Sequence, residues 1–121
     1  QDEKADIASV YLNRLRRGIP LQADPTVKFA VGDPTLRRIL KVHLKTDSPY
    51  NTYLYRGLPP GPVCTPSAAS IDAVLADKKT SYLYFCARED FSGYHAFASN
   101  LSAHNANARR YHRALNERKI R

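Results

Sequence analysis

The sequence predicts an α+β fold: a small, mostly antiparallel sheet packed with several helices, the last of them long. Two observations carry this prediction. Apolar residues recur at helical spacing near both ends of the chain. A run of β-forming residues at 81–87 (SYLYFCA) is followed, after a turn containing glycine, by a second run at 95–99 (HAFAS).

The first helix is expected close to the N-terminus. Ile7, Val10, Tyr11 and Leu15 recur at helical spacing, three arginines add positive charge toward the C-terminal end, and Gly18 can supply a left-handed cap. These features together are typical of an amphipathic helix.

Two copies of the sequence Asp-Pro-Thr, at 24–26 and 33–35, predict two short helices. In each copy the aspartate would cap the helix and the proline would occupy its first position. The first helix should stop near Gly32. The second should turn three apolar residues inward: Leu36, Ile39 and Leu40.

The rest of the chain alternates extended and helical patterns. Residues 42–54 favour an extended segment broken by Pro49, and Thr65-Pro66 repeats the cap-and-proline pattern. The helix that follows should bury three residues: Ile71, Val74 and Leu75. After the two strands, a last helix is expected over residues 101–118, with Leu101, Ala108, Tyr111 and Leu115 on one face.

Length and composition limit the protein class. The 121 residues suffice for a single domain with its own core and are too few for two. The formal net charge of +8 indicates a polyanion or an acidic surface as partner. Nucleic acid is not the expected partner, because the sequence has no RNP-type aromatic strand, CxxC framework or P-loop.

The two cysteines and the chain ends suggest the context. Cys64 and Cys86 lie in apolar surroundings and are interpreted as small buried residues rather than as a disulfide. The sequence contains no apolar run of transmembrane length and no signal peptide. Because it opens without methionine and enters a helical pattern almost at once, we interpret it as a piece cut from a longer protein.

The sequence shows no evident catalyst. Its four histidines lack metal-ligand spacing, so neither a metal nor a cofactor is expected. Asp24 and Asp33 are explained as caps, and Glu89 and Asp90 as solvated loop residues. No carboxyl group stands in the apolar pocket that a general acid needs.

Polar and aromatic residues indicate a binding surface instead. Amide and hydroxyl groups beside tyrosine faces, as in LQADPT and SPYNT, suit sugar hydroxyls and N-acetyl groups. The candidate substrate-binding residues are Gln22, Asp24, Ser48, Tyr50, Asn51, Thr52, Tyr53 and His95. Structural alternatives stay open for several of them: turn chemistry for Ser48 and Asn51, a helix cap for Asp24, and a partly buried histidine bonded to the backbone for His95.

Four segments of the chain resemble one known family. They are ASVYLNRLRRGIPLQADPTV, DSPYNTYLYRGLPPGPV, YLYFCA and YHAFASNLSAHNANARRY. Their order and spacing are similar to those of the YceG-like family, the endolytic murein transglycosylases of the bacterial cell envelope. The resemblance covers essentially the whole chain, although the second Asp-Pro-Thr, at Asp33, lies outside the family pattern.

The resemblance implies a location and a partner. Members of the family are typically anchored by one N-terminal transmembrane helix, carry a LysM-like subdomain, and cut nascent peptidoglycan on the extracytoplasmic, periplasmic side of the membrane. Residues 1–121 would be the C-terminal part of the catalytic domain, without the anchor or the LysM-like part. Glycan strands are the expected partner, with wall-synthesis enzymes as further partners.

The resemblance also implies a reaction. A glutamate protonates the glycosidic oxygen and then helps the muramic acid 6-hydroxyl attack the anomeric carbon, which leaves a 1,6-anhydro end. One carboxylate suffices because the substrate supplies the nucleophile. The family's glutamate lies upstream of Gln1, and Glu3 aligns with a different glutamate. No catalytic residue is therefore expected in this chain, which would be inactive by itself.

Two other functions stay open. The chain could be a noncatalytic peptidoglycan-binding module that positions another enzyme. An old label of the family, aminodeoxychorismate lyase, would require pyridoxal phosphate on a Schiff-base lysine. Lys78 and Lys79 lie between a helix and a strand, without the phosphate-binding glycine loop that such an enzyme needs.

Overall fold

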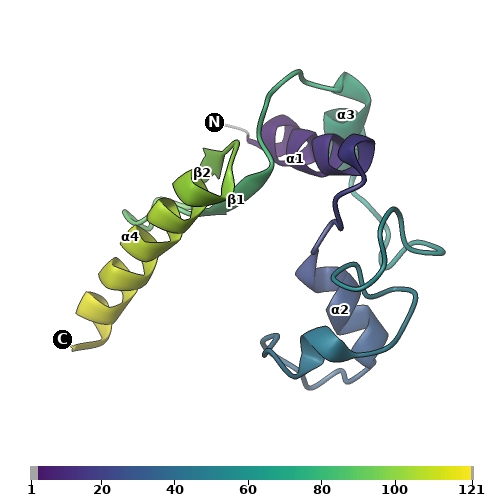
Figure 1. Ribbon diagram of the computed structural model, residues 1–121, viewed down its shortest axis with the longest axis horizontal. Helices are drawn as coiled ribbons and strands as arrows, with labels where there is room; N and C mark the ends of the chain where they lie inside the picture. Colours follow the sequence, from purple (N-terminus) through teal and green to yellow (C-terminus); the bar gives the residue numbers. More distant parts are fainter. Residues whose placement is uncertain (1–2, 121) are drawn as a thin grey trace. The chain divides into compact units, whose positions relative to one another are not determined.

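The computed structural model describes residues 3–120, and the side chains of residues 3–118. The chain divides into two compact units, Gln1–Asn13 with Ala68–Arg121, and Arg14–Ser67. We call the first the hairpin unit and the second the loop unit (Figure 1). The described residues form four α-helices, one 3-10 helix and one antiparallel pair of strands, which confirms the α+β prediction. That the two units make up a single domain stays a prediction.

A β-hairpin lies at the centre of the hairpin unit. β1 (Tyr84–Ala87) and β2 (His95–Ala98) pair so that Phe85 lies opposite Phe97. The predicted turn between them is present, with Gly93 at a φ of +88° that other residues rarely adopt. Both predicted strands are confirmed, the first three residues shorter at its start than expected.

The two faces of the hairpin pack against different helices, because side chains alternate across a strand. On one face, the ring of Phe85 meets Tyr11 of α1 (Lys4–Arg17) edge-on, with centroids 5.9 Å apart. On the other face, Tyr84 stacks on His104 of α4 (Leu101–Ile120) at 4.9 Å. Figure 1 shows α4 running on directly from β2, as the sequence predicts.

Hydrogen bonds tie α1 to the segment before β1. The Asn13 side-chain nitrogen donates to the carbonyl oxygens of Thr80 and Tyr82, at 3.0 and 2.9 Å. The buried Ser9 hydroxyl lies 2.7 Å from Thr80 Oγ1. The buried apolar residues of this unit are Val10, Ala73, Leu83 and Ala98.

The loop unit is built on α2 (Asp24–Val31). The helix ends at Gly32, whose φ of +74° forms the left-handed cap and whose N–H donates to the Lys28 carbonyl. The 3-10 helix η1 (His43–Lys45) packs against α2, within the segment that the sequence predicts to be extended. The buried residues of the loop unit are Arg14, Leu21, Thr26, Val27, Asn51 and Thr52.

The predicted helix at Asp33 does not form. The Asp33 carboxylate accepts hydrogen bonds from the backbone N–H and the hydroxyl of Thr35, at 2.9 and 2.7 Å. These bonds lower the pKa of Asp33 and close a local turn that competes with a helix. Leu40, expected to point inward, is 48% exposed.

Two predictions of burial are also wrong. α3 (Ala68–Ala76) forms after Thr65-Pro66, but its buried residue is Ala73, whereas Ile71, Val74 and Leu75 are exposed. Cys64 is exposed, while Cys86 is partly buried. Both cysteines are free, as predicted, and burial raises the pKa of the Cys86 thiol.

Candidate functional site

The tyrosine-rich loop at 47–62 is ordered by Asn51. This side chain is fully buried, and its nitrogen donates to the carbonyls of Leu44 and Thr46 at 3.0 and 2.8 Å. Its oxygen accepts the Tyr53 N–H at 2.9 Å. Asn51 therefore performs the turn chemistry that the sequence left open, and it joins the loop to η1. Direct contact of Asn51 with a ligand stays a prediction.

Thr52 joins the same loop to the start of α2. Its hydroxyl accepts the Ala23 N–H at 2.9 Å and lies 2.7 Å from Thr26 Oγ1. Because Thr26 donates its one hydroxyl proton to the Ala23 carbonyl at 2.6 Å, Thr52 must be the donor between the two hydroxyls. Thr52 is 1% exposed, so these bonds lie out of water. A ligand role for Thr52 likewise stays a prediction.

Next to the buried residues Asn51 and Thr52, Asp24 and Tyr53 form an exposed hydrogen-bonded pair. The Tyr53 hydroxyl donates to Asp24 Oδ1 at 2.6 Å, across 29 positions of sequence. The residue before α2 is Ala23 and no side chain caps the helix, so the predicted capping role of Asp24 is wrong. Its carboxylate instead lies at the surface beside a phenol, where both groups can meet a ligand.

Gln22 lies directly before this pair and is exposed. Its backbone φ of +52° is unusual for a residue other than glycine, and its N–H donates to the Thr52 carbonyl at 3.2 Å. A strained backbone held by its neighbours occurs often at binding sites. This conformation therefore favours a ligand-facing role for Gln22.

Tyr50 packs between α2 and the proline-rich turn. Its ring lies 4.7 Å from that of Phe29, and a Cβ on Gly61 would come within 3.1 Å of its hydroxyl. The hydroxyl of Ser48 accepts the Tyr50 N–H at 3.1 Å, which is the turn chemistry left open for that serine. A side chain at position 61 would therefore require the Tyr50 hydroxyl to move by a few tenths of an ångström.

His95 belongs to the hairpin unit, whereas the other seven predicted site residues lie in the loop unit. Its backbone N–H donates to Glu3 Oε1 at 2.9 Å, and its Nδ1 lies 3.0 Å from the same oxygen. The imidazole is 30% exposed and the Glu3 side chain 19%. Glu3 orients the ring through Nδ1, so Nε2 is the nitrogen left for a ligand.

The sequence gives no indication that Glu3 contacts the predicted site residue His95. The other missed groups are Lys28, Arg37 and Arg38, which converge on a hollow beside Asp24. The Arg-Arg pair was visible in the sequence, but its position depended on the turn at Asp33. A contact across 92 positions, as between Glu3 and His95, left no local signal.

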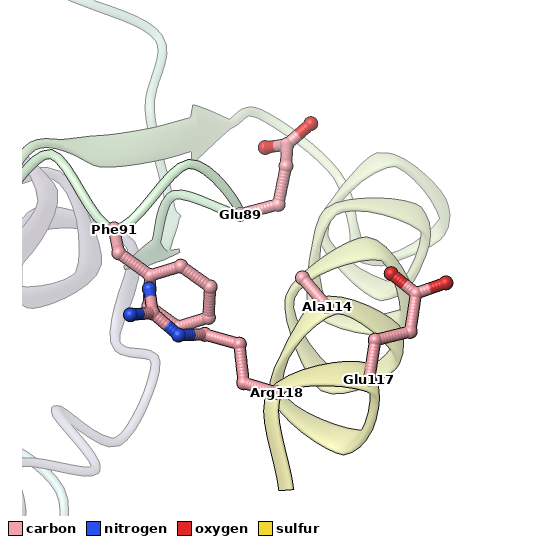
Figure 2. Close-up of a pocket in the computed structure, with 5 residues that line it drawn as sticks. All are labelled: Glu89, Phe91, Ala114, Glu117 and Arg118. Atoms are coloured by element: carbon pink, nitrogen blue, oxygen red, sulfur yellow. The ribbon is translucent and has the colours of Figure 1, made fainter. Parts of the chain in front are cut away.

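A separate hollow of about 470 Å³ lies at the hairpin turn and α4 (Figure 2). The guanidinium of Arg118 lies over the Phe91 ring, 4.5 Å from its centroid, and the Glu89 carboxylate pairs with Arg110 at 3.4 Å. Glu89 and Glu117 both line this hollow and both are exposed. Neither has the apolar surroundings of a general acid.

The lysines that a pyridoxal enzyme would need are engaged in ion pairs. Lys78 pairs with Asp6 at 2.7 Å, and Lys79 with Asp77 at 2.8 Å. The hydrogen bond to Asp6 raises the pKa of Lys78, which is opposite to the lowered pKa of a Schiff-base lysine. The arrangement of these two lysines therefore does not favour the lyase reading.

The described residues form neither a metal-binding cluster nor a membrane-spanning helix. Within residues 3–120, no three His, Cys, Asp or Glu side chains come together in a way that could hold a metal ion. None of the helices in that range is both long enough and apolar enough to span a bilayer.

Known proteins are similar to this chain in sequence and in structure. An endolytic murein transglycosylase of Bacillus subtilis (strain 168) is 44% identical over 119 residues, which is 96% of this chain and 32% of the relative. A protein of the same name from Streptococcus pneumoniae is 34% identical over 88% of this chain and 20% of its own length. A solved yceG-like protein from Listeria monocytogenes has a TM-score of 0.74 and 42% identity, over 83% of this chain and 31% of that chain.

The chain thus spans about a third or less of the length of these relatives. A model of the YceG-like family matches residues 1–110, the range that holds both α2 with its tyrosine-rich loop and the Glu3–His95 pair. This match and the 44% identity over nearly the whole chain show that it belongs to the YceG-like family.

Proposed function

We propose that this chain forms the glycan-holding part of an endolytic murein transglycosylase. The observation that carries the proposal is the exposed Asp24–Tyr53 pair on a buried, hydrogen-bonded base, in a chain whose relatives carry that name. The parent enzyme cuts peptidoglycan strands within their length and leaves 1,6-anhydromuramoyl ends.

The exposed groups suit a sugar ligand. Asp24 accepts hydrogen bonds, Tyr53 both donates and accepts, and the Gln22 amide adds two donors and an acceptor. The loop that carries Tyr53 is already fixed by Asn51 and Thr52, so binding has little chain entropy to remove. In this proposal the two buried residues act by holding the surface, and the exposed ones contact the strand.

The general acid comes from elsewhere in the parent protein. The reaction needs a carboxyl group that carries a proton to the glycosidic oxygen, and family resemblance puts it upstream of Gln1. Glu3 instead accepts the backbone N–H of His95, and its Oε1 lies 3.0 Å from His95 Nδ1. We therefore assign Glu3 the orientation of His95 rather than proton transfer to substrate.

The test replaces Asp24 in the full-length protein. Asp24→Asn should lower the release of 1,6-anhydro products from purified peptidoglycan, measured by mass spectrometry, by about tenfold, the effect of one lost charged hydrogen bond. Asp72→Asn is the matched control, because it removes the same charge at an exposed position of α3. Equal activity of both variants and the wild type would refute the assignment of Asp24.

A noncatalytic module remains the second candidate. It is favoured by the fact that the carboxyl groups described above are exposed, ion-paired or, as for Glu3, bonded to His95. Sedimentation with peptidoglycan and product analysis on the full-length protein separate the two proposals. Sedimentation without any 1,6-anhydro product would favour the module, whereas product that disappears with the upstream glutamate changed to glutamine would favour the enzyme.

We further place the parent protein at the extracytoplasmic face of the bacterial membrane, held there by an N-terminal helix and working beside wall-synthesis enzymes. The murein substrate lies on that side of the membrane, which supports this placement. Protease added to intact spheroplasts should degrade the domain if it lies outside. Protection equal to that of a cytoplasmic marker would contradict this location.

A further inference from the structure

Two adjacent hollows lie along α2 in the loop unit. The first, of about 590 Å³, is lined by Asp24, Pro25, Lys28, Arg37, Arg38 and Ile39. The second, of about 550 Å³, is lined chiefly by Phe29, Pro34, Val63 and Cys64. Pro25 and Lys28 line both hollows, so the two are continuous along the helix.

The first hollow is basic. Three cations, Lys28, Arg37 and Arg38, face it with a single carboxylate, that of Asp24. The Asp24 carboxylate already accepts the Tyr53 hydroxyl, and the ion pairs found among the described residues involve other cations. Two arginines side by side can each take a carboxylate through two parallel hydrogen bonds, so the hollow suits a ligand with more than one carboxylate.

The second hollow is apolar. Phe29 is 47% exposed and is held in place by the Tyr50 ring. Pro34, Val63 and Cys64 add apolar surface, which suits small apolar side chains such as the methyl group of alanine. The Asp33 carboxylate also lines this hollow, and it already accepts the N–H and the hydroxyl of Thr35.

We propose that the continuous hollows bind the acidic peptide that a murein strand carries, with its carboxylates at Lys28, Arg37 and Arg38 and its alanine methyls at Phe29. This inference rests on the proposed function. Asp24 lies both in the glycan-facing pair and in the basic hollow. A sugar on that pair therefore has its peptide branch beside the cations, and the enzyme distinguishes peptide-bearing strands from bare glycan.

The test compares two substrates with the full-length protein. One is uncrosslinked murein with its peptides, and the other is the same murein after an amidase has removed them. Arg37→Gln with Arg38→Gln should lower kcat/KM on peptide-bearing strands about tenfold and leave it unchanged on bare strands. Arg109→Gln with Arg113→Gln, which removes two exposed arginines of α4, should change neither value.

A loss of equal size on both substrates, or no loss on peptide-bearing strands, would overturn the inference. If the wild type cleaves neither substrate, the proposed function fails. A measurement of peptide binding then still tests whether the hollows form a peptide site. The fluorescently labelled tetrapeptide released by the amidase should then bind the wild type about tenfold more tightly than the Arg37 and Arg38 double variant. The same peptide with its carboxylates amidated should bind both proteins equally weakly, and amidated peptide that binds as well as the acid would overturn the site.

Discussion

Replacing Thr52 with valine tests whether the buried hydroxyls hold the candidate site together. Valine has nearly the same shape as threonine but leaves the Ala23 N–H without its acceptor at 2.9 Å and Thr26 Oγ1 without its donor at 2.7 Å. A buried N–H that loses its partner costs about 1–3 kcal/mol. Since Thr52 is 1% exposed, water cannot replace the bond, and we expect a loss of about 2 kcal/mol in the free energy of unfolding.

The assay is urea unfolding followed by circular dichroism, with thermal unfolding beside it. In a chain of this size, about 2 kcal/mol corresponds to a fall in Tm of roughly 8 °C. Thr52→Ser keeps the hydroxyl and removes one buried methyl group, which costs about 1 kcal/mol. Thr65→Val is the control, since Thr65 is exposed, and it should change the stability by less than about 0.5 kcal/mol.

The order of the variants decides the argument. If hydrogen bonding dominates, Thr52→Val is less stable than Thr52→Ser. If packing dominates, the order is reversed, and the account of the site as a surface held by buried hydroxyls is wrong. A free energy of unfolding of Thr52→Val within about 0.5 kcal/mol of the wild-type value would equally refute this account of the site.

Three further changes probe the same units. At pH 8 a thiol reagent should modify the exposed Cys64 well before Cys86, because burial raises the pKa of the Cys86 thiol. The reaction rate of Cys86 should keep rising with pH after the rate of an unperturbed thiol has levelled off. Equal rates in the two single Cys→Ser variants would contradict this prediction. Tyr53→Phe should weaken sedimentation with peptidoglycan as much as Asp24→Asn does. The double variant should bind no more weakly than either single variant, because the two residues act as one pair. Additive losses would show that they have separate roles. Gly57→Ala should cost about 1 kcal/mol in urea unfolding, because φ is +83° there; an unchanged midpoint would show that the turn relaxes.

The sequence predicts the regular elements well because their signals are local. Two runs of β-forming residues around a glycine turn mark the hairpin, and helical spacing marks α1 and α4. The two Asp-Pro-Thr copies show where local signals end. Thr26 and Thr35 both follow Asp-Pro, yet the first copy starts a helix that Thr52 holds from 26 positions away, while the second closes on Thr35 itself. Long-range contacts therefore decide between a helix and a turn in two nearly identical segments.

The candidate site is predicted in part for the same reason. The segments at 22–24 and 48–53 are brought together, as composition suggested. Which of their residues support the surface and which face the solvent depends on burial. Asn51 and Thr52 are buried, whereas Gln22 and Asp24 are exposed. The charge of Asp24 predicts its exposure, but Asn51 and Gln22 carry the same amide group and only the fold separates them. The basic hollow depends on a turn that the cap-and-proline pattern predicts wrongly.

The contact between Glu3 and His95 bears on where the reaction's acid lies. A general acid must hold a proton, and apolar surroundings favour that form. Glu3 is partly buried, but its oxygens accept the backbone N–H of His95 and lie beside His95 Nδ1 rather than in apolar surroundings. The same contact leaves His95 with Nε2 for a ligand. In the proposed enzyme, an acid supplied by another part of the protein is therefore compatible with this geometry, and the proposed role of Glu3 is to orient His95.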